Sequence, residues 1–332
     1  MISATTSARP PALDSPPSAA YGRVDRIGFI GSDWLHMKLV TFTDATGAAP
    51  RVGVADDGTG EVRDVSELLP AGAGVLEVIE DWSTLGPVLA ERAPSLAARP
   101  LDSVRLLAPI PRPRRNVFCV GKNYRAHVAE FGRSGYDRPD RSEDLPEHPV
   151  VFSKATTAVT GPFDDVLAHA GVTSELDYEA ELAVIIGRGG RGISREAAFE
   201  HVWGYTIVDD VTARDLQRRH SQWLLGKSLD THCPMGPYAV SADEIADVSA
   251  LQVESSVNGE PRQSAPVKDL IFDIPELVAT ISAGITLEPG DVIATGTPAG
   301  VGIGFDPPRF LAPGDVVEIS VTGLGRQRSR IV

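Results

Sequence analysis

Residues 177–192 read DYEAELAVIIGRGGRG, and this stretch decides how the chain folds. Its middle part, ELAVII, is short, apolar and followed at once by glycines, which predicts a buried β-strand that ends in a turn. Glu179 and Glu181 stand one residue apart at its start. Because successive side chains of a strand point to opposite faces, the two carboxylates share a face, with Cα atoms about 6.6 to 6.8 Å apart.

A second acidic pair follows a second strand-like run, GYTIVDDV at residues 204–211. Asp209 and Asp210 point to opposite faces where this strand ends, so at most one of them can easily join the glutamates. Buried carboxylates need a neutralising charge. Three carboxylates without histidine or thiolate favour a hard ion, Mg²⁺, with Mn²⁺ or Ca²⁺ as alternatives. The competing interpretation of the glutamates is the exposed polar face of an edge strand.

Composition limits the class of protein. The 332 residues include 31 Lys plus Arg and 45 Asp plus Glu, for a net charge of −14. This charge repels phosphate backbones and anionic membrane surfaces, so neither nucleic acid nor membrane is expected as a partner. Prolines interrupt Arg112, Arg114 and Arg115, which favours a solvated or domain-joining segment over a basic patch.

The cysteines and the N-terminus indicate the compartment. Cys119 and Cys233 lie far apart without a CxxC or Cys/His spacing, so we expect neither a disulfide framework nor a zinc site. The first 20 residues lack the basic and continuous apolar regions of a secretory signal. We therefore expect a cytoplasmic protein whose residues 1–36 form a disordered tail.

Two units are predicted, with a boundary near Pro111. Residues 37–110 begin with the β-rich runs MKLVTFTD and RVGVADD and continue with apolar residues at helix-like intervals between Val75 and Trp82. They are interpreted as a small N-terminal accessory domain. The proline-punctuated LLAPIPRPRRN, residues 106–116, marks the crossing into a metal-binding catalytic domain at 111–332.

The second unit is rich in strands. Its strand-like runs are VVFS, ELAVII, YTIVDDV, YAVS, QVESSVNG, DVIATGT and DVVEISV. The turns EPGD at 288–291 and APGD at 312–315 are typical of hairpins. Helical signals between strands are confined to 194–201 and about 274–281, too few to cover both faces of a parallel sheet. The predicted fold class is therefore α+β and β-rich, with a mixed sheet.

A histidine and a glutamate form the second candidate constellation. His127 and Glu130 lie three residues apart in CVGKNYRAHVAEFG, so on a helix they share one face. The carboxylate can then orient the imidazole as a general base. An ordinary surface contact is the competing interpretation.

Six ordered segments together resemble the fumarylacetoacetate hydrolase family, from about Asn116 to the C-terminus. They are CVGKNYRAHVAE (119–130), VVFSK (150–154), DYEAELAV (177–184), DDVTARDLQ (209–217), GKSLDT (226–231) and TGTPAGVG (295–302). The resemblance implies a mixed β-sheet roll or sandwich of this family's type, with the accessory domain in front. It also implies a homodimer, although no sequence spacing shows an interface.

The resemblance assigns roles to individual residues. It implies Glu179, Glu181 and Asp210 as metal ligands, Lys227 in the active site, and His127 with Glu130 on a mobile lid. It implies further that Gln217 contacts the substrate and that Gly296 and Thr297 lie in a turn near the substrate carboxylate. Many relatives carry Asn in place of Asp209, which here adds local negative charge.

Physical chemistry is compatible with these roles. The apolar neighbours of Lys227 in WLLGKSLD could depress its pKa or let its ammonium stabilise an enolate. The glycines of ATGTPAGVGIG leave backbone N–H groups able to approach an anion, although a tight structural turn is equally compatible.

The implied reaction acts on a small 2-oxo acid. The leading hypothesis is hydrolysis of the C–C bond of an acylpyruvate-type 2,4-dioxo acid, in which His127 activates water and the metal with Lys227 stabilises the pyruvate enolate. The alternatives reach related enolates: decarboxylation of an oxaloacetate-type acid, or isomerisation of 2-hydroxyhepta-2,4-diene-1,7-dioate in aromatic-acid catabolism. A metal-binding scaffold without catalysis would need neither His127 nor Lys227.

The glycine cluster at 187–192 supports a different class of function. It satisfies G-x-G-x-x-G, follows a strand and precedes the helix-like SREAAFEHV, as a dinucleotide fingerprint does. Two charged glutamates just upstream and the lack of repeated βαβ units argue against it. An ordinary strand-to-helix turn with Ser194 as N-cap is favoured, and a dinucleotide-binding protein is a remote alternative.

Overall fold

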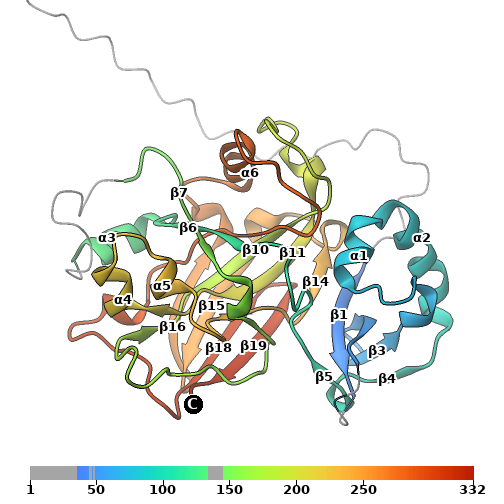
Figure 1. The fold of residues 1–332 in the computed structure, drawn as a ribbon, viewed down its shortest axis with the longest axis horizontal. Coiled ribbons are helices and arrows are strands. Elements are labelled where there is room, and N and C mark those ends of the chain that lie inside the picture. Colours follow the sequence, from blue (N-terminus) through green and yellow to red (C-terminus); the bar gives the residue numbers. More distant parts are fainter. Residues whose placement is uncertain (1–35, 45–46, 48, 134–144) are drawn as a thin grey trace, which may run out of the picture. The chain divides into compact units, whose positions relative to one another are not determined.

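A mixed sheet of eleven strands organises the chain (Figure 1). The computed structural model describes residues 36–44, 47, 49–133 and 145–332. The hydrogen-bonded order is β4 (Ala98–Pro100), β3 (Glu61–Asp64), β2 (Arg51–Asp56), β1 (Lys38–Thr43), β14 (Ala239–Ser241), β11 (Val202–Asp209), β10 (Ala180–Ile186), β17 (Val292–Ala294), β6 (Val117–Gly121) and β7 (Val150–Lys154), with β5 (Arg105–Leu106) beside β1. The β17–β6 pair is parallel and the other pairs are antiparallel.

Strand β10 is buried on both faces, which explains its nearly continuous apolar sequence. On one face, Leu182 and Val184 belong to a core that also contains side chains of a four-stranded sheet and of helix α6 (Ile274–Ser282). On the other face, Ala183 and Ile185 share a core with side chains of α1 (Val75–Glu80) and α2 (Trp82–Arg92). The smaller sheet has the order β16 (Glu260–Pro266), β15 (Gln252–Val257), β18 (Val316–Val321) and β19 (Gly325–Arg330).

Short elements complete the fold. The other helices are α1 (Val75–Glu80), α2 (Trp82–Arg92), α3 (Arg125–Arg133), α4 (Arg214–Arg219) and α5 (Leu224–Lys227). Two small two-stranded sheets pair β9 (Leu176–Asp177) with β12 (Thr212–Ala213), and β8 (Val159–Thr160) with β13 (Cys233–Pro234). The predicted α+β, β-rich class with a mixed sheet is confirmed. In the part of the chain that the structure describes, no helix is long and apolar enough to cross a membrane.

The strands of 37–110 continue the large sheet, because β1 pairs with β14 through Lys38↔Val240 and Leu39↔Ala239. Two arginines of the proline-punctuated segment make ion pairs. Arg114 donates two hydrogen bonds to Glu80 of α1, and Arg115 pairs with Asp291. The predicted tail 1–36 lies outside the described residues except for His36.

Two local expectations were wrong. The segment 194–201 forms only a 3₁₀ helix at Ala198–His201, and Ser194 caps no α-helix. The two Pro-Gly-Asp turns exist, with left-handed Gly290 and Gly314, but neither joins the two strands of a hairpin. They lead instead into β17, which pairs with β10 and β6, and into β18, which pairs with β15 and with the following strand β19. Short turn motifs specify the local bend and leave strand pairing to tertiary contacts.

Candidate metal centre and active site

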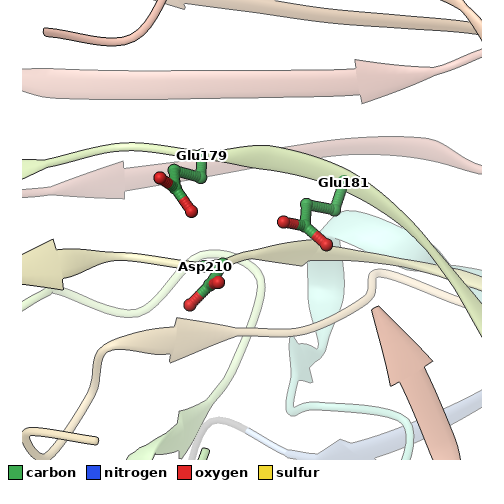
Figure 2. Close-up of side chains that lie close together, drawn as sticks. All are labelled: Glu179, Glu181 and Asp210. Carbon is green, nitrogen blue, oxygen red and sulfur yellow. The ribbon is translucent and has the colours of Figure 1, made fainter. Parts of the chain in front are cut away.

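Three carboxylates meet where β10 begins and β11 ends. The strands pair antiparallel with Glu181 opposite Val208, and the Asp210 N–H bonds to the Glu179 carbonyl at 2.9 Å. This register brings one oxygen from each of Glu179, Glu181 and Asp210 within 4.8 Å of the others. Figure 2 shows the three side chains close together, with both glutamates extending toward the segment that carries Asp210. Both glutamates are at most 4% exposed, which excludes the interpretation as an exposed strand face.

Asp209 points elsewhere, as the alternation along a strand predicts. Its Oδ1 accepts the Glu179 N–H at 2.9 Å, so this side chain supports the backbone beside the triad. Burial raises the pKa of Asp209 to about 7, even though the Glu179 N–H acts in the opposite direction. An Asn could accept the same bond without the charge, which gives a physical reason why Asn can occupy this position.

Buried cations surround the triad. Lys227 bonds to Glu179 at 2.5 Å and to Asp210 at 2.7 Å. Arg214 pairs with Glu179 at 2.5 Å, and Lys154 bonds to Asp210 at 2.6 Å. All three cations are at most 2% exposed. Among the described residues, Glu181, in contrast, accepts a backbone N–H and no ammonium or guanidinium group.

The charges of this buried cluster fit a divalent cation. Its carboxylates are Asp177, Glu179, Glu181, Asp209 and Asp210, and its cations are Lys154, Arg214 and Lys227. With every carboxyl group ionised, five negative charges against three positive charges leave a formal excess of two. Carboxylate oxygens are the ligands of hard divalent ions, and an uncompensated buried charge is costly, so the residues present fit an ion such as Mg²⁺ or Mn²⁺.

The glutamates of the triad differ in pKa because their neighbours differ. Burial would raise the pKa of Glu179, but the charges of Arg214 and Lys227 outweigh it and hold the pKa well below its usual range. Burial raises the pKa of Glu181 well above its usual range, and the negative charges of Asp210 and Glu179 add to the effect. Glu181 is therefore the ligand that most needs a positive partner.

Lys227 has a raised pKa, so the expected depression by apolar neighbours was wrong. Burial does act to lower its pKa, but Asp210 and Glu179 together raise it. The side chain is thus an ammonium group at neutral pH. This leaves its second expected role, stabilisation of developing negative charge, as the one that the electrostatics support.

The His127–Glu130 pair lies on α3, on one face as predicted. The Nδ1 of His127 is 3.3 Å from Oε2 of Glu130, and both side chains are at most 11% exposed, so this is no ordinary surface contact. Glu130 also accepts the Gly300 N–H at 2.9 Å. A Cβ on Gly304 would fall 1.9 Å from the Glu130 carboxylate, so only glycine permits this approach.

The turn at 296–297 holds the triad. The Gly296 N–H donates to Glu181 at 2.7 Å. It is therefore not available to bind the carboxylate of a substrate, which was the role expected for it. Thr297 lines the pocket, and its hydroxyl donates to the Ala180 carbonyl at 3.0 Å. Gln217 also lines the pocket and accepts a hydrogen bond from Arg214.

One small pocket joins these groups. It is lined by Val120, Gly121, Lys122, His127, Phe131, Phe152, Glu179, Glu181, Arg214, Gln217, Trp223, Lys227 and Thr297.

Sequence reasoning missed three charged residues of this cluster. Arg214, Lys154 and Asp177 received no role. In the structure Asp177 accepts hydrogen bonds from Arg214 and from the Gly302 N–H, which links the triad to the 300–304 loop.

The glycine cluster at 187–192 is used for packing. The Gly187 N–H donates to the His201 carbonyl at 2.8 Å, and the Gly190 N–H donates to the Leu287 carbonyl at 2.9 Å. These donors are directed to protein carbonyls, and no α-helix starts here to bind a pyrophosphate. The geometry disfavours dinucleotide binding at this turn.

Comparison with known proteins defines the class. Residues 116–332 match the family model of the fumarylacetoacetate (FAA) hydrolase C-terminal region, and the chain belongs to this family. It is a metal-dependent enzyme of the family, with the carboxylate triad that such an activity requires.

Particular relatives refine this result. The chain is 54% identical to oxaloacetate tautomerase YisK of Bacillus subtilis over 231 residues, 70% of this chain and 74% of the relative. It is 38% identical to the mitochondrial oxaloacetate tautomerase FAHD2A of Bos taurus, over 90% of this chain and 92% of the relative. A solved maleylpyruvate hydrolase from Sphingobium sp. SYK-6, in complex with manganese(II) and pyruvate, superposes with a TM-score of 0.71 at 31% identity, covering 89% of this chain and 99% of that chain.

Proposed function

We propose that the protein catalyses the keto–enol tautomerisation of an oxaloacetate-type 2-oxo acid, with Glu179, Glu181 and Asp210 holding a divalent cation. The observation that carries the proposal is that His127 and the triad glutamates line the same pocket. Support also comes from the two relatives named oxaloacetate tautomerases. Mg²⁺ or Mn²⁺ would polarise the 2-oxo group when bound.

His127 and Lys227 have different roles in this proton transfer. Tautomerisation breaks the C3–H bond, forms an O–H bond at the 2-oxo oxygen and breaks no bond between heavier atoms. His127 removes the C3 proton in our proposal, because Glu130 holds its Nδ1 and leaves Nε2 as the reacting nitrogen. Lys227, charged at neutral pH, stabilises the negative charge that develops on the oxygen.

Hydrolysis of an acylpyruvate is the second candidate. It uses the same enolate-stabilising groups but requires His127 to activate a water molecule. The structural similarity to a maleylpyruvate hydrolase favours it. Tautomerisation is preferred because the relatives with the higher identities carry that name and because it requires only proton transfer.

Two parallel measurements, of tautomerisation and of pyruvate release, test this proposal. Conversion of oxaloacetate between its enol and keto forms is followed by ultraviolet absorbance with Mn²⁺ present, and pyruvate release from oxaloacetate and an acylpyruvate is measured in parallel. We expect tautomerisation to dominate in the wild type. His127→Asn should lower its rate about 10²- to 10⁴-fold, the usual contribution of a general base.

A matched histidine variant controls for nonspecific effects. His220 lies at the end of α4 and does not line the pocket, so His220→Asn should keep the wild-type rate. Rapid pyruvate release from the acylpyruvate without tautomerisation would replace the proposal by the hydrolase alternative. If the wild type shows neither tautomerisation nor pyruvate release, both the tautomerase and the hydrolase candidates are excluded.

A further inference from the structure

The two carboxylate oxygens of Asp210 have different partners. Oδ1 accepts a hydrogen bond from the Lys154 ammonium group at 2.6 Å, and Oδ2 accepts one from Lys227 at 2.7 Å. Lys227 lines the active-site pocket, whereas Lys154 is not among the described residues that line it. The two lysines thus divide Asp210 into an oxygen on the interior side and an oxygen on the pocket side.

The ammonium group of Lys154 is fixed by its surroundings. Its side chain is fully buried at the end of β7, and Nζ donates a second hydrogen bond to the Val211 carbonyl at 3.0 Å. Moving this group away from Oδ1 of Asp210 would leave a buried charge unpaired, which is costly. A divalent cation on Oδ1 would also meet the ammonium charge at close range. Oδ1 is therefore closed to a metal ion.

The two glutamates show the same division. Oε1 of Glu179 pairs with the buried guanidinium group of Arg214 at 2.5 Å. Oε2 of Glu181 accepts the Gly296 N–H at 2.7 Å. One oxygen of each glutamate is thus held by a donor of the protein.

The other oxygens of the triad converge. Lys227 bonds to Oε2 of Glu179 and to Oδ2 of Asp210, at 2.5 and 2.7 Å, so these two oxygens point to one place. One oxygen from each triad residue lies within 4.8 Å of the other two. The triad therefore presents three single oxygens to an ion.

We infer that Lys154 makes the site selective for Mg²⁺ over Ca²⁺, because it keeps Asp210 a ligand through one oxygen. This inference rests on the metal site of the proposed function and adds the choice of ion. Mg²⁺ takes about six oxygens and keeps several waters, whereas Ca²⁺ takes roughly six to eight and often binds both oxygens of a carboxylate. With Lys154 on Oδ1, Asp210 cannot supply the additional oxygen that favours Ca²⁺. Lys154 is thus a positioning residue that acts through Asp210.

Displacement of bound Mn²⁺ measures this selectivity without substrate. Electron paramagnetic resonance follows the release of Mn²⁺ from the loaded protein as Mg²⁺ or Ca²⁺ is added. For the wild type we expect the Kd for Ca²⁺ to exceed that for Mg²⁺ about tenfold or more. Lys154→Met frees Oδ1 of Asp210 and should lower this ratio about tenfold, because Ca²⁺ gains a ligand oxygen that Mg²⁺ does not use. A loss of charge or of structure alone would change both Kd values alike.

Control variants and one measurement on the wild type complete the test. Lys154→Arg keeps a cationic donor on Oδ1 and should keep the wild-type ratio, as should Lys38→Met, which breaks the more exposed pair with Asp57. Circular dichroism checks that each variant is folded. Electron–nuclear double resonance in ¹⁷O-labelled water needs no variant, and should count about three water ligands on Mn²⁺, since three single oxygens fill half of roughly six positions.

The outcomes separate this inference from the proposed function. Equal affinity of the wild type for Mg²⁺ and Ca²⁺ would overturn the inference, as would fewer water ligands or an unchanged ratio in folded Lys154→Met. Failure of the wild type to bind Mn²⁺ would overturn it together with the metal site. If the ratio falls in Lys154→Met but the wild type does not tautomerise oxaloacetate, the proposed reaction is wrong and the ion selectivity stands.

Discussion

Strand β10 has a motif that suggests a binding site at each end: the carboxylate pair at its start and the glycine cluster 187–192 after it. The two motifs differ in whether their polar groups are hydrogen-bonded within the protein. At the start, Glu179 and Glu181 face a pocket and meet Asp210. At the other end, the N–H groups of the glycine cluster donate to carbonyls of distant segments, as Gly190 does to Leu287. The carboxylates at the start of β10 retain an uncompensated negative charge. The N–H groups at its other end are already paired with carbonyls of the protein.

This contrast gives a physical criterion for a site. A buried polar group is ordinarily paired within the protein, and a group that remains underpaired beside a pocket marks a place for a ligand. Glu181 meets that criterion because, within the part of the chain that the structure describes, it accepts a single backbone N–H while two like charges lie beside it. The glycine cluster does not meet it, because its N–H groups donate to protein carbonyls.

The largest expected effect follows from removing a ligand at the pocket end. Glu181→Ala should lower metal-dependent tautomerisation about a thousandfold or more, because polarisation by a metal contributes several kcal/mol. The initial rate at saturating Mn²⁺ measures this. Glu254→Ala, on the exposed face of β15, should keep the wild-type rate. Substantial activity in Glu181→Ala would remove this residue from the site.

The next effect, on stability, concerns the buried ion pair between Lys154 and Asp210. Lys154→Met should lower the free energy of unfolding by about 3 to 5 kcal/mol, because it leaves the Asp210 carboxylate with one buried partner fewer. Urea denaturation of the metal-free protein measures it. Lys38→Met breaks a more exposed pair with Asp57 and should cost about 1 kcal/mol or less. Equal losses in the two variants would contradict the distinction.

A pH-dependent effect follows from Asp209. Its pKa of about 7 lies above the ordinary value of 3.8, so between these values the folded state binds more protons than the unfolded state. Stability of the metal-free protein should therefore fall as pH rises from about 4 to 7, by up to roughly 1.4 kcal/mol per pH unit from this group. Asp209→Asn should remove that part of the slope, and an unchanged slope would disprove the assignment.

The smallest effect tests the packing end of β10. A Cβ on Gly189 would lie 2.8 Å from the Leu287 carbonyl oxygen, so Gly189→Ala should lower the free energy of unfolding by about 1 to 3 kcal/mol. The catalytic rate should not change. Gly284→Ala, where a Cβ meets open space, is the matched control and should cost little. Loss of activity in the folded Gly189 variant would show that this end also has a functional role.

Local periodicity explains what could be predicted. The period of two along a strand put Glu179 and Glu181 on one face, and the helical i,i+3 spacing paired His127 with Glu130. The β-rich runs were recognised because strands are short and bounded by turn residues. The family resemblance then selected Asp210 over Asp209.

Long-range contacts explain what could not be predicted. Lys154 is buried because Asp210, 56 residues away, needs its charge, and Arg214 is buried against Asp177. A long cationic side chain is usually exposed, so no local pattern distinguishes these two from surface residues. The same limit applies to the glycine cluster, whose hydrogen-bond acceptors lie in segments that are distant in sequence.

Titration of the metal-free protein with Mn²⁺, followed by electron paramagnetic resonance, tests most directly whether the pocket end of β10 is the metal site. We predict one tightly bound ion per chain for the wild type and for Gly189→Ala, and loss of tight binding for Glu179→Ala. Unchanged stoichiometry and affinity in the Glu179 variant would place the ion elsewhere and contradict the assignment.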